Sequence, residues 1–378
     1  MLTSIIILTH NQLQYTKECI HSIRKYTVQE EYELIVVDNA SMDGTVEWLQ
    51  KQPDITLIKN LENMGFPRGC NQGISTAKGE NILLLNNDVI VTEQWLTNLL
   101  KCLYAKENTA AVGPVTNNAS YYSTIHTCYG GIQEMQEFAS LYNQSDENKW
   151  EERMKLIGFC MLIKKTVLDE IGLLDERFTP GNYEDDDLSL RMFEKGYKLY
   201  LCRDTFIHHY GSMSWKEDVS KFSMILNEND RKFYDKWGFS SADLYIQYDL
   251  LEVADRYEVD KVNILQVGAG CGATLLEMKR RYAVADVYGV ESNQQAASIS
   301  NRVAPTACIQ YDNLQEVFPG KRFHIILLSH PIEKEQLSGV INSISHRLAS
   351  KGTVIMSSAN LINYTALQNQ LTSYEKIE

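Results

Sequence analysis

The sequence predicts an α/β protein in which a doubly wound, mostly parallel sheet is followed by a second, smaller α/β unit. Short apolar runs alternate with segments of helical periodicity, a pattern typical of parallel sheets covered by helices. Near Lys261 the alternation starts again, with an apolar run and a glycine-rich turn. The chain has 378 residues, enough for two such units.

The alternation of the apolar runs also sets the predicted domain boundaries. We expect a first domain at residues 1–238, a charged helical connector at 239–260 and the second domain at 261–378. Segment 116–155 is polar and rich in Tyr and Asn, and we expect a variable loop with a helical part there. The predicted strands lie at residues 3–9, 33–38, 55–58, 81–88, 110–114, 156–163, 197–201, 262–267, 286–290, 324–328 and 352–356.

Composition argues against several classes of protein. The net charge is −13, with 49 acidic and 36 basic residues, so we expect no broad nucleic-acid surface. Eight scattered cysteines without a CxxC pair favour a reducing compartment over a disulfide framework. No apolar run approaches the ~20 residues of a membrane span, and the start of the chain lacks the basic region of a signal peptide. We therefore expect a cytoplasmic protein.

Polar side chains gather where the first predicted strands end. Because the carboxyl ends of parallel strands face one crevice, Asp38 and the run Asn86, Asn87 and Asp88 are expected to meet there. A hard divalent cation takes oxygen ligands, often one or two carboxylates plus a diphosphate. Asp88 could anchor such a cation, and Asp38 could bind a base or ribose. Turn and helix-capping duty is the competing interpretation for each residue taken singly.

Two further clusters carry chemistry. The acidic run at residues 184–187 packs carboxylates at a helix start, which raises the pKa of at least one and suits a general base. The alternative is a solvated acidic helix end. His208 and His209 end another predicted strand, where an imidazole could complete the shell of a cation. Adjacent strand residues point to opposite faces, so at most one of the two is expected to act.

Taken together in this order, these motifs resemble a known family. Residues 1 to about 238 look like a GT-A fold, inverting glycosyltransferase of family 2, near its rhamnosyltransferase-like members. The sequence departs from the DxD metal motif of that family, because Asn86 stands where the first Asp is usual. The matching segments are residues 4–11, 37–45, 63–66, 71–74, 85–88, 172–178 and 184–191.

The resemblance implies a reaction and roles for the residues. A metal-dependent enzyme would move a sugar, with inversion, from a UDP- or dTDP-sugar to a hydroxyl of a surface glycan or of a protein Ser or Thr. Asp185 would be the catalytic base with Glu184 beside it, and Asp88 and His209 would hold Mn2+ or Mg2+. The implied nucleotide-sugar-binding residues are Thr9, Asn11, Asp38, Asn39, Asn63, Gly65, Arg68 and Asn87.

The second domain carries its own motif. Gly268, Gly270 and Gly272 follow a predicted strand, and Glu291 ends the next strand, a pattern that permits close backbone approach to a nucleotide-like ligand. This region resembles a class I S-adenosylmethionine-dependent methyltransferase that is incomplete at its C-terminus. The rivals to glycosyl transfer are therefore an O-methyltransferase acting through this domain and a degenerate, non-enzymatic scaffold.

Overall fold

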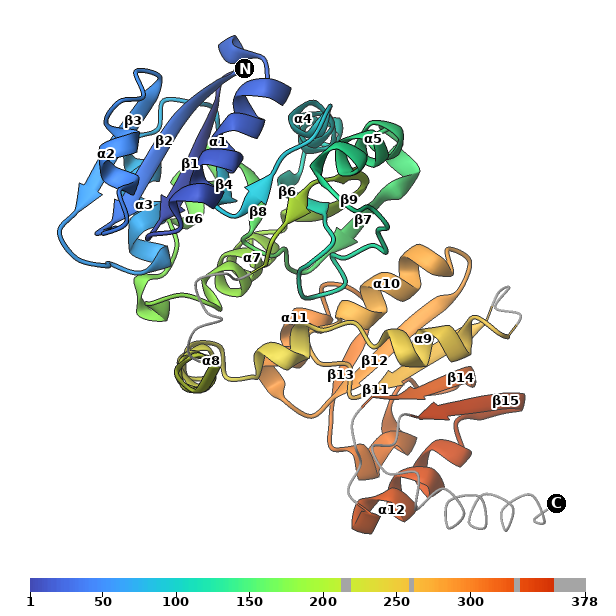
Figure 1. Cartoon of the computed structure of the whole chain (residues 1–378). Helices are drawn as coiled ribbons and strands as arrows, with labels where there is room; N and C mark the ends of the chain where they lie inside the picture. Colours follow the sequence, from blue (N-terminus) through green and yellow to red (C-terminus); the bar gives the residue numbers. More distant parts are fainter. Residues whose placement is uncertain (212–218, 258–261, 330–333, 357–378) are drawn as a thin grey trace. The chain divides into compact units, whose positions relative to one another are not determined.

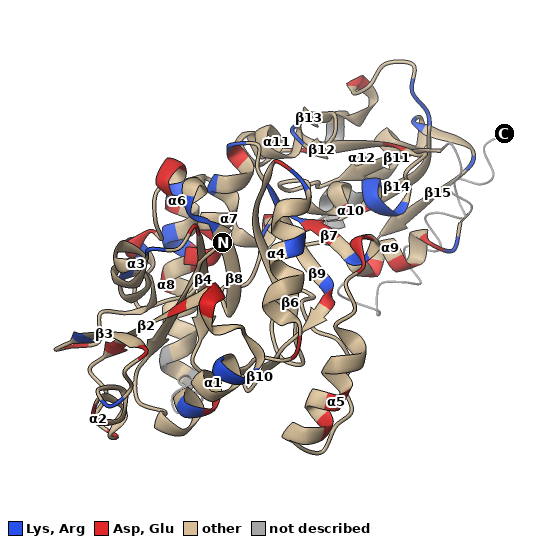
Figure 2. Cartoon of the chain, turned by 90° about the horizontal axis from the view of Figure 1, so that it is seen from above, with Lys and Arg blue, Asp and Glu red and all other residues tan. Residues whose placement is uncertain are grey.

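The computed structural model describes residues 1–211, 219–257, 262–329 and 334–356, and the chain divides into two compact units, Met1–Ser241 and Ala242–Glu378 (Figure 1). Residues 242–257, part of the expected connector, belong to the second unit and contain α9 (Tyr248–Ala254). None of the described helices is both long and apolar enough to span a bilayer. Basic and acidic residues are interspersed over the helices and strands (Figure 2).

The first unit is built on an eight-stranded sheet in the order β3-β2-β1-β4-β8-β6-β9-β7. β8 and β7 run antiparallel to their neighbours, and the other strands share one direction, so the predicted mostly parallel sheet is confirmed. The strands are β1 (Thr3–Thr9), β2 (Tyr32–Asn39), β3 (Ile55–Asn60), β4 (Asn81–Asn86), β6 (Thr109–Val115), β7 (Trp150–Arg153), β8 (Cys160–Lys164) and β9 (Lys198–Phe206).

Helices cover both faces of this sheet. Alternation along β1 sends Ile5 and Ile7 into a core shared with α1 and α4, and Ile6 into a core shared with α3 and α7. This division confirms the doubly wound arrangement. The helices of the unit are α1 (Leu13–Tyr26), α2 (Thr45–Leu49), α3 (Phe66–Thr76), α4 (Trp95–Ala105), α5 (Ile132–Tyr142), α6 (Lys165–Ile171), α7 (Glu184–Glu194) and α8 (Val219–Trp237).

Two segments differ from the sequence prediction. The strand expected at residues 81–88 ends at Asn86, because a turn follows and residues 89–90 form β5 (Val89–Ile90) in a separate ribbon with β10 (His208–His209). Segment 116–155 contains α5 and also strand β7, which pairs with β9. The strand was not predicted because the composition of β7 is polar, although its Trp150 and Arg153 are buried.

The second unit has a five-stranded sheet in the order β13-β12-β11-β14-β15, and all of its strand pairs are parallel. The expected α/β class, a doubly wound, mostly parallel sheet followed by a second, smaller α/β unit, is confirmed. The C-terminal incompleteness expected of this unit concerns residues 357–378, which lie outside the described residues. Its remaining elements are β11 (Asn263–Val267), α10 (Ala273–Arg281), β12 (Asp286–Glu291), α11 (Gln294–Ser300), β13 (Thr306–Cys308), β14 (Phe323–Leu328), α12 (Lys334–Ser345) and β15 (Leu348–Met356).

Candidate active site

The ribbon of β5 and β10 brings Asp88 and His209 together. Its antiparallel register pairs His209 with Val89, and the Tyr210 backbone N–H donates to the Asp88 carbonyl at 3.0 Å. The two side chains come from positions far apart in the sequence, yet His209 Nε2 lies 3.2 Å from Asp88 Oδ1. Asp88 is 6% exposed and His209 5% exposed. The predicted pair of metal ligands is therefore a buried contact.

The hydrogen bond at the other ring nitrogen assigns the tautomer of His209. Nδ1 lies 2.7 Å from the carbonyl oxygen of Asn118, and a carbonyl only accepts, so Nδ1 carries the proton. In the neutral ring, Nε2 then presents a lone pair toward the Asp88 carboxylate, and it has no hydrogen-bond partner among the described residues. Phe159 stacks on the imidazole, with ring centroids 5.2 Å apart, and helps to fix its plane.

Two electron-pair donors at this distance suit a cation between them. Among the described residues, no group of three or more His, Cys, Asp or Glu side chains is placed to hold a metal ion. Asp88 and His209 therefore fit a divalent cation, such as Mn2+ or Mg2+, that takes its remaining ligands from a diphosphate and from water. Asn86 and Asn87 add no carboxylate to the pair.

Asp185 lies at the first turn of α7 and is partly exposed. Its Oδ2 accepts the Gly158 backbone N–H at 2.8 Å. Burial is the main cause that raises the pKa of Asp185 to about 6, the neighbouring Asp186 raises it further, and Lys155 opposes the rise. At neutral pH Asp185 is therefore mostly ionised but basic enough to accept a proton, as a general base requires.

Glu184, the preceding residue, has a different environment. It is buried, and Oε2 has no hydrogen-bond partner among the described residues. Burial, followed by the charge of Asp185, raises the pKa of Glu184 well above its usual range. Both causes favour the protonated form of Glu184 over the carboxylate. Of the two residues predicted to be catalytic, Asp185 has the properties of a base.

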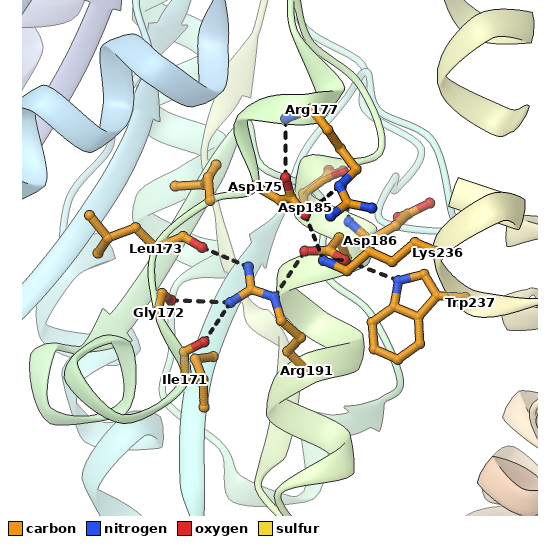
Figure 3. A network of polar contacts seen from close by, with 12 residues as sticks. Ile171, Gly172, Leu173, Asp175, Arg177, Asp185, Asp186, Arg191, Lys236 and Trp237 are labelled. Atoms are coloured by element: carbon orange, nitrogen blue, oxygen red, sulfur yellow. Dashed lines mark hydrogen bonds and ion pairs between the residues drawn. The ribbon is translucent and has the colours of Figure 1, made fainter. Parts of the chain in front are cut away.

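The last acid of the run, Asp187, anchors the helix. Its carboxylate is fully buried and accepts from Arg191 Nε at 2.9 Å and from Trp237 Nε1 at 3.0 Å. Lys236 from α8 forms an ion pair with the same carboxylate and with Asp175. Arg191 also donates to three successive backbone carbonyls at residues 171–173 (Figure 3). The interactions tie the start of α7 to α8 and to the loop after α6.

Residues Gly158 and Phe159 connect the base to the cation pair. Gly158 donates its N–H to Asp185, while the adjacent Phe159 stacks on His209. The Phe159 carbonyl also accepts the Asn86 N–H at 2.9 Å, at the end of β4. The predicted base, the predicted metal ligands and the strand end therefore surround one short loop.

Asp38 and Asn11 lie at the same edge of the sheet. Asp38 is fully buried, and one carboxylate oxygen accepts the Ser41 N–H at 2.9 Å. Its Oδ2 has no hydrogen-bond partner among the described residues, which suits a ligand that donates to it. The Asn11 side chain accepts from the Met42 N–H at 2.8 Å, and the Asn11 N–H donates to Ser41 Oγ at 2.7 Å. Asn11 thus orders the loop beside Asp38.

Asn39 and Asn63 shape the neighbouring loop. Asn39 Nδ2 donates to Asn63 Oδ1 at 3.2 Å and to the Gly65 carbonyl at 3.1 Å, and Asn39 Oδ1 accepts from Asn60 at 2.8 Å. Asn63 Oδ1 accepts the Gly65 N–H at 3.0 Å. The Asn39 amide therefore bonds to its own chain on both sides and holds this loop.

The other predicted donor residues have mixed placements. Asn87 Nδ2 donates to the hydroxyls of Thr9 at 3.3 Å and Thr16 at 3.0 Å, so the side chains of Asn87 and Thr9 fasten β1, α1 and the β4 turn together. Arg68 is half exposed, and its Nε lies 3.8 Å from Glu176. That surface pair leaves the guanidinium accessible to a ligand.

In the second unit, the glycine loop already contacts its own chain. Glu291 is 4% exposed, and its Oε2 accepts the Gly270 N–H at 2.8 Å. A Cβ on Gly270 would lie 2.7 Å from the Asp243 carbonyl, and one on Gly272 would lie 3.0 Å from Ser300. Gly268 has a φ of 76°. These contacts explain the glycines by packing, and S-adenosylmethionine binding stays a prediction.

Part of the first unit is similar to a known protein family. Residues 4–172 match the model of the family described as Glycosyl transferase family 2. The chain is 24% identical over 200 residues to the glycosyltransferase GlyG of Streptococcus pneumoniae, an alignment covering 51% of this chain and 64% of GlyG. It is also 23% identical over 218 residues to a Mycobacterium tuberculosis N-acetylglucosaminyl-diphospho-decaprenol L-rhamnosyltransferase, covering 50% and 69%.

The match to whole relatives is partial. The chain spans 64% of the length of an uncharacterized Bacillus subtilis glycosyltransferase, YfnE, with 24% identity. Among solved structures, a mannosyltransferase from Pyrobaculum calidifontis in complex with GDP-Man and Mn2+ is similar, with a TM-score of 0.46 and 19% identity. That similarity covers 62% of this chain and 64% of the mannosyltransferase.

Sequence reasoning missed the residues that support the candidate site of the first unit. Asn118 fixes His209, Gly158 donates to Asp185, and Lys155 forms an ion pair with Asp186. All three lie in or near the polar segment that has no clear periodicity. Gly158, just before strand β8, is the one local signal in the sequence that could have pointed to a supporting residue. The other two roles depend on tertiary contacts that no local pattern encodes.

Proposed function

We propose that the first unit is a family 2, metal-dependent, inverting glycosyltransferase that moves a sugar from a nucleotide-sugar donor to a hydroxyl acceptor. The observation that carries the proposal is the buried Asp88–His209 contact at 3.2 Å, in which the Nδ1 bond to Asn118 turns Nε2 toward the Asp88 carboxylate. Asp185, with its pKa raised to about 6 by burial, lies beside the same loop and supports a base-assisted transfer.

The chain's own residues define a sequence of roles. Asp38 offers its unpartnered oxygen to the base or ribose of the donor, and the loop from Asn63 to Gly65 would cover the diphosphate. A divalent cation held by Asp88 and His209 would neutralise charge on the departing nucleoside diphosphate. Asp185 would accept the proton of the acceptor hydroxyl as that oxygen attacks the anomeric carbon. Attack from the side opposite the leaving diphosphate inverts the configuration.

The substrates belong to this proposal as well. We expect a UDP- or dTDP-sugar as donor, and the similarity to a rhamnosyltransferase supports a hexose or deoxyhexose. The acceptor would be a bacterial surface glycan or a Ser or Thr hydroxyl of a protein. We also propose a cytoplasmic location, which eight free cysteines support.

A panel of nucleotide sugars with Mn2+ tests the proposal through release of the nucleoside diphosphate. The wild-type protein should turn over at least one donor, and removal of Mn2+ with a chelator should abolish the activity. Asp88→Ala and Asp185→Asn should each lose at least about 100-fold. Asp169→Asn, in a surface ion pair with Lys165, is the matched control and should keep full activity. Equal background turnover in the wild type and Asp185→Asn would favour a non-enzymatic scaffold.

A further inference from the structure

Lys155 is a buried cation next to the predicted base. It lies between β7 and β8, and its side chain is 2% exposed. Burying an ammonium group is costly unless it is paired and hydrogen-bonded. Its Nζ lies 2.8 and 2.9 Å from the two carboxylate oxygens of Asp186, a residue of α7. The same Nζ lies 4.7 Å from the centre of the Tyr121 ring.

The ion pair is accompanied by two hydrogen bonds between this segment and the first turns of α7. The Leu156 N–H donates to Ser189 Oγ at 3.2 Å, and the Gly158 N–H donates to Asp185 Oδ2 at 2.8 Å. Residues 155, 156 and 158 are therefore each fastened to the helix. The position of the Asp185 carboxylate depends on this alignment, because Gly158 holds one of its oxygens.

The charges around Asp185 come from two elements. Asp186 and Glu184 lie on its own helix, and Lys155 is the described cation that faces it from the segment before β8. Burial and the Asp186 charge raise the pKa of Asp185, whereas Lys155 lowers it. The Lys155 ammonium group is bound to Asp186. It therefore offsets the negative charge of Asp186, which disfavours the carboxylate form of the neighbouring Asp185.

We propose that Lys155 is a positioning residue that, through its buried ion pair with Asp186, aligns Asp185 and keeps it in the carboxylate form. This inference rests on the proposed function, because it assigns Lys155 to the same base. Lys155 itself need not contact a substrate. Its effect should appear mainly in the acidic part of the pH profile, where the base begins to be protonated.

Three variants separate the electrostatic effect from a packing effect. Lys155→Met leaves the Asp186 charge uncompensated. The apparent pKa on the acidic side (the acidic limb) of the pH dependence of kcat/KM should therefore rise by roughly one pH unit. A one-unit move predicts about a ninefold loss at pH 5 and little change at pH 8. Asp186→Asn should move the limb down. The double variant Lys155→Met/Asp186→Asn removes both charges and should return the limb to the wild-type position or below it.

A second readout requires no turnover. The full chain, labelled with 13C in its Asp carboxyl groups, is titrated by NMR, and the Asp185 signal is identified by its loss in Asp185→Asn. Its midpoint should rise in Lys155→Met and fall in the double variant relative to that single variant. Circular dichroism confirms that each variant is folded, and the double variant guards against misfolding caused by one unpaired buried charge.

The outcomes are distinct. Superimposed Asp185 midpoints in the wild type, Lys155→Met and the double variant would overturn the role of Lys155, even in an active enzyme. A surface control, Lys165→Met, should leave the midpoint unchanged; an equal shift there would also overturn it. If the wild type transfers no sugar from any donor, the proposed function fails instead, while the NMR titration still decides the electrostatic link.

Discussion

Adjacent carboxyl groups at the start of α7 acquire different properties from their surroundings. Asp187 is satisfied by Arg191, Lys236 and Trp237, whereas Asp185 receives backbone N–H donors and remains partly exposed. Glu184 is buried without a partner for one of its oxygens in the described structure. Environments that push neighbouring pKa values apart are typical of acid–base sites.

The raised pKa of Asp185 predicts that the carboxylate needed for activity lowers the stability of the folded protein near neutral pH. Its pKa is about 6 in the folded protein against an ordinary value of 3.8, mainly because of burial. The folded state therefore binds this proton more tightly than the unfolded state, and stability falls as pH rises from about 4 to about 7. Asp185→Asn should raise the free energy of unfolding at pH 7.5 by roughly 1–3 kcal/mol.

Urea unfolding at pH 4 and pH 7.5 measures that prediction. The gain of Asp185→Asn over the wild type should shrink at pH 4, where Asp185 is largely protonated in the folded protein. Transfer activity should meanwhile fall at least about 100-fold. Lower stability than the wild type at pH 7.5 would show that the carboxylate is favourable in the fold, against the cause assigned to its pKa.

At the scale of single residues, the sequence predicted which residue types belong to the candidate site better than it predicted which groups they contact. The approach of Asp88 to His209 depends on the β5–β10 ribbon, which no periodic pattern marks because each strand has only two residues. The Asn39 amide, expected to bind the donor, instead bonds to Asn60 and Asn63. Only the folded chain shows which polar groups are already satisfied.

Among the elements, the loop before α3 depends on one backbone conformation. Gly65 has a φ of 80°, and a Cβ there would lie 2.7 Å from Thr179 Cγ2 and 3.0 Å from Pro180 Cα. Gly65→Ala should cost about 1–3 kcal/mol of stability and raise KM for the donor, because the loop to Asn63 must shift.

Gly131→Ala is the matched control for the glycine substitution. Its φ of −169° is extended, and a Cβ there meets nothing within 4 Å. Thermal unfolding and donor kinetics on both variants make the comparison. Equal stability and KM for Gly65→Ala and the wild type would show that the loop tolerates the change and that its tight packing is unimportant.

The attachment of α7 to α8 predicts a second effect on stability. Asp187→Asn removes the buried charge that pairs with Arg191 and Lys236, and should cost about 3 kcal/mol. Arg231→Ala removes an ion pair with Asp235 in which both side chains are more than half exposed, and should cost under about 0.5 kcal/mol. Similar losses in the two variants, measured by urea unfolding, would contradict the anchoring role.

Strong periodicity made many of the elements predictable. The apolar runs at β1, β2, β11 and β14 appear within a residue or two of their expected bounds. β7 and β13 were missed, because the first is charged and the second has only three residues. In both strands, pairing with a neighbour supplies what local sequence does not.

At the scale of the whole molecule, each unit has a core of its own. The first unit buries Ile5, Ile6 and Leu83 among its helices and strands, and the second buries Leu265 and Ile326 in a separate cluster. All candidate donor residues lie in the first unit. A donor with Mn2+ should therefore stabilise the first unit selectively, by mass action.

Scanning calorimetry of the full chain tests this selectivity. We expect two transitions, of which only one moves to higher temperature on addition of Mn2+ and the nucleotide sugar that is turned over. Adding S-adenosylmethionine alone tests the prediction for the second unit, where Glu291 already accepts from Gly270. A donor-induced shift of both transitions would contradict the assignment of the donor site to the first unit alone.

Most of the order of strands and helices was predictable, apart from β7 and β13, because each unit repeats the same alternation. The unit boundary was harder, since the charged segment after Trp237 gives no composition shift at Ser241. The convergence of Asp88, Asp185 and His209 on one loop required the folded sheet. Sequence order alone separates Asp88 from His209 by the whole of the variable segment.

The most direct test of the account is Mn2+ binding followed by electron paramagnetic resonance. UDP and dTDP are each titrated with Mn2+ in the presence of the wild type, Asp88→Asn or Asp54→Asn, the last removing a surface partner of Arg24. The wild type and Asp54→Asn should take up Mn2+ with one of the nucleotides, and Asp88→Asn should bind it at least about tenfold more weakly. Equal uptake by Asp88→Asn and the wild type would contradict the assignment of Asp88 and His209 as the cation site.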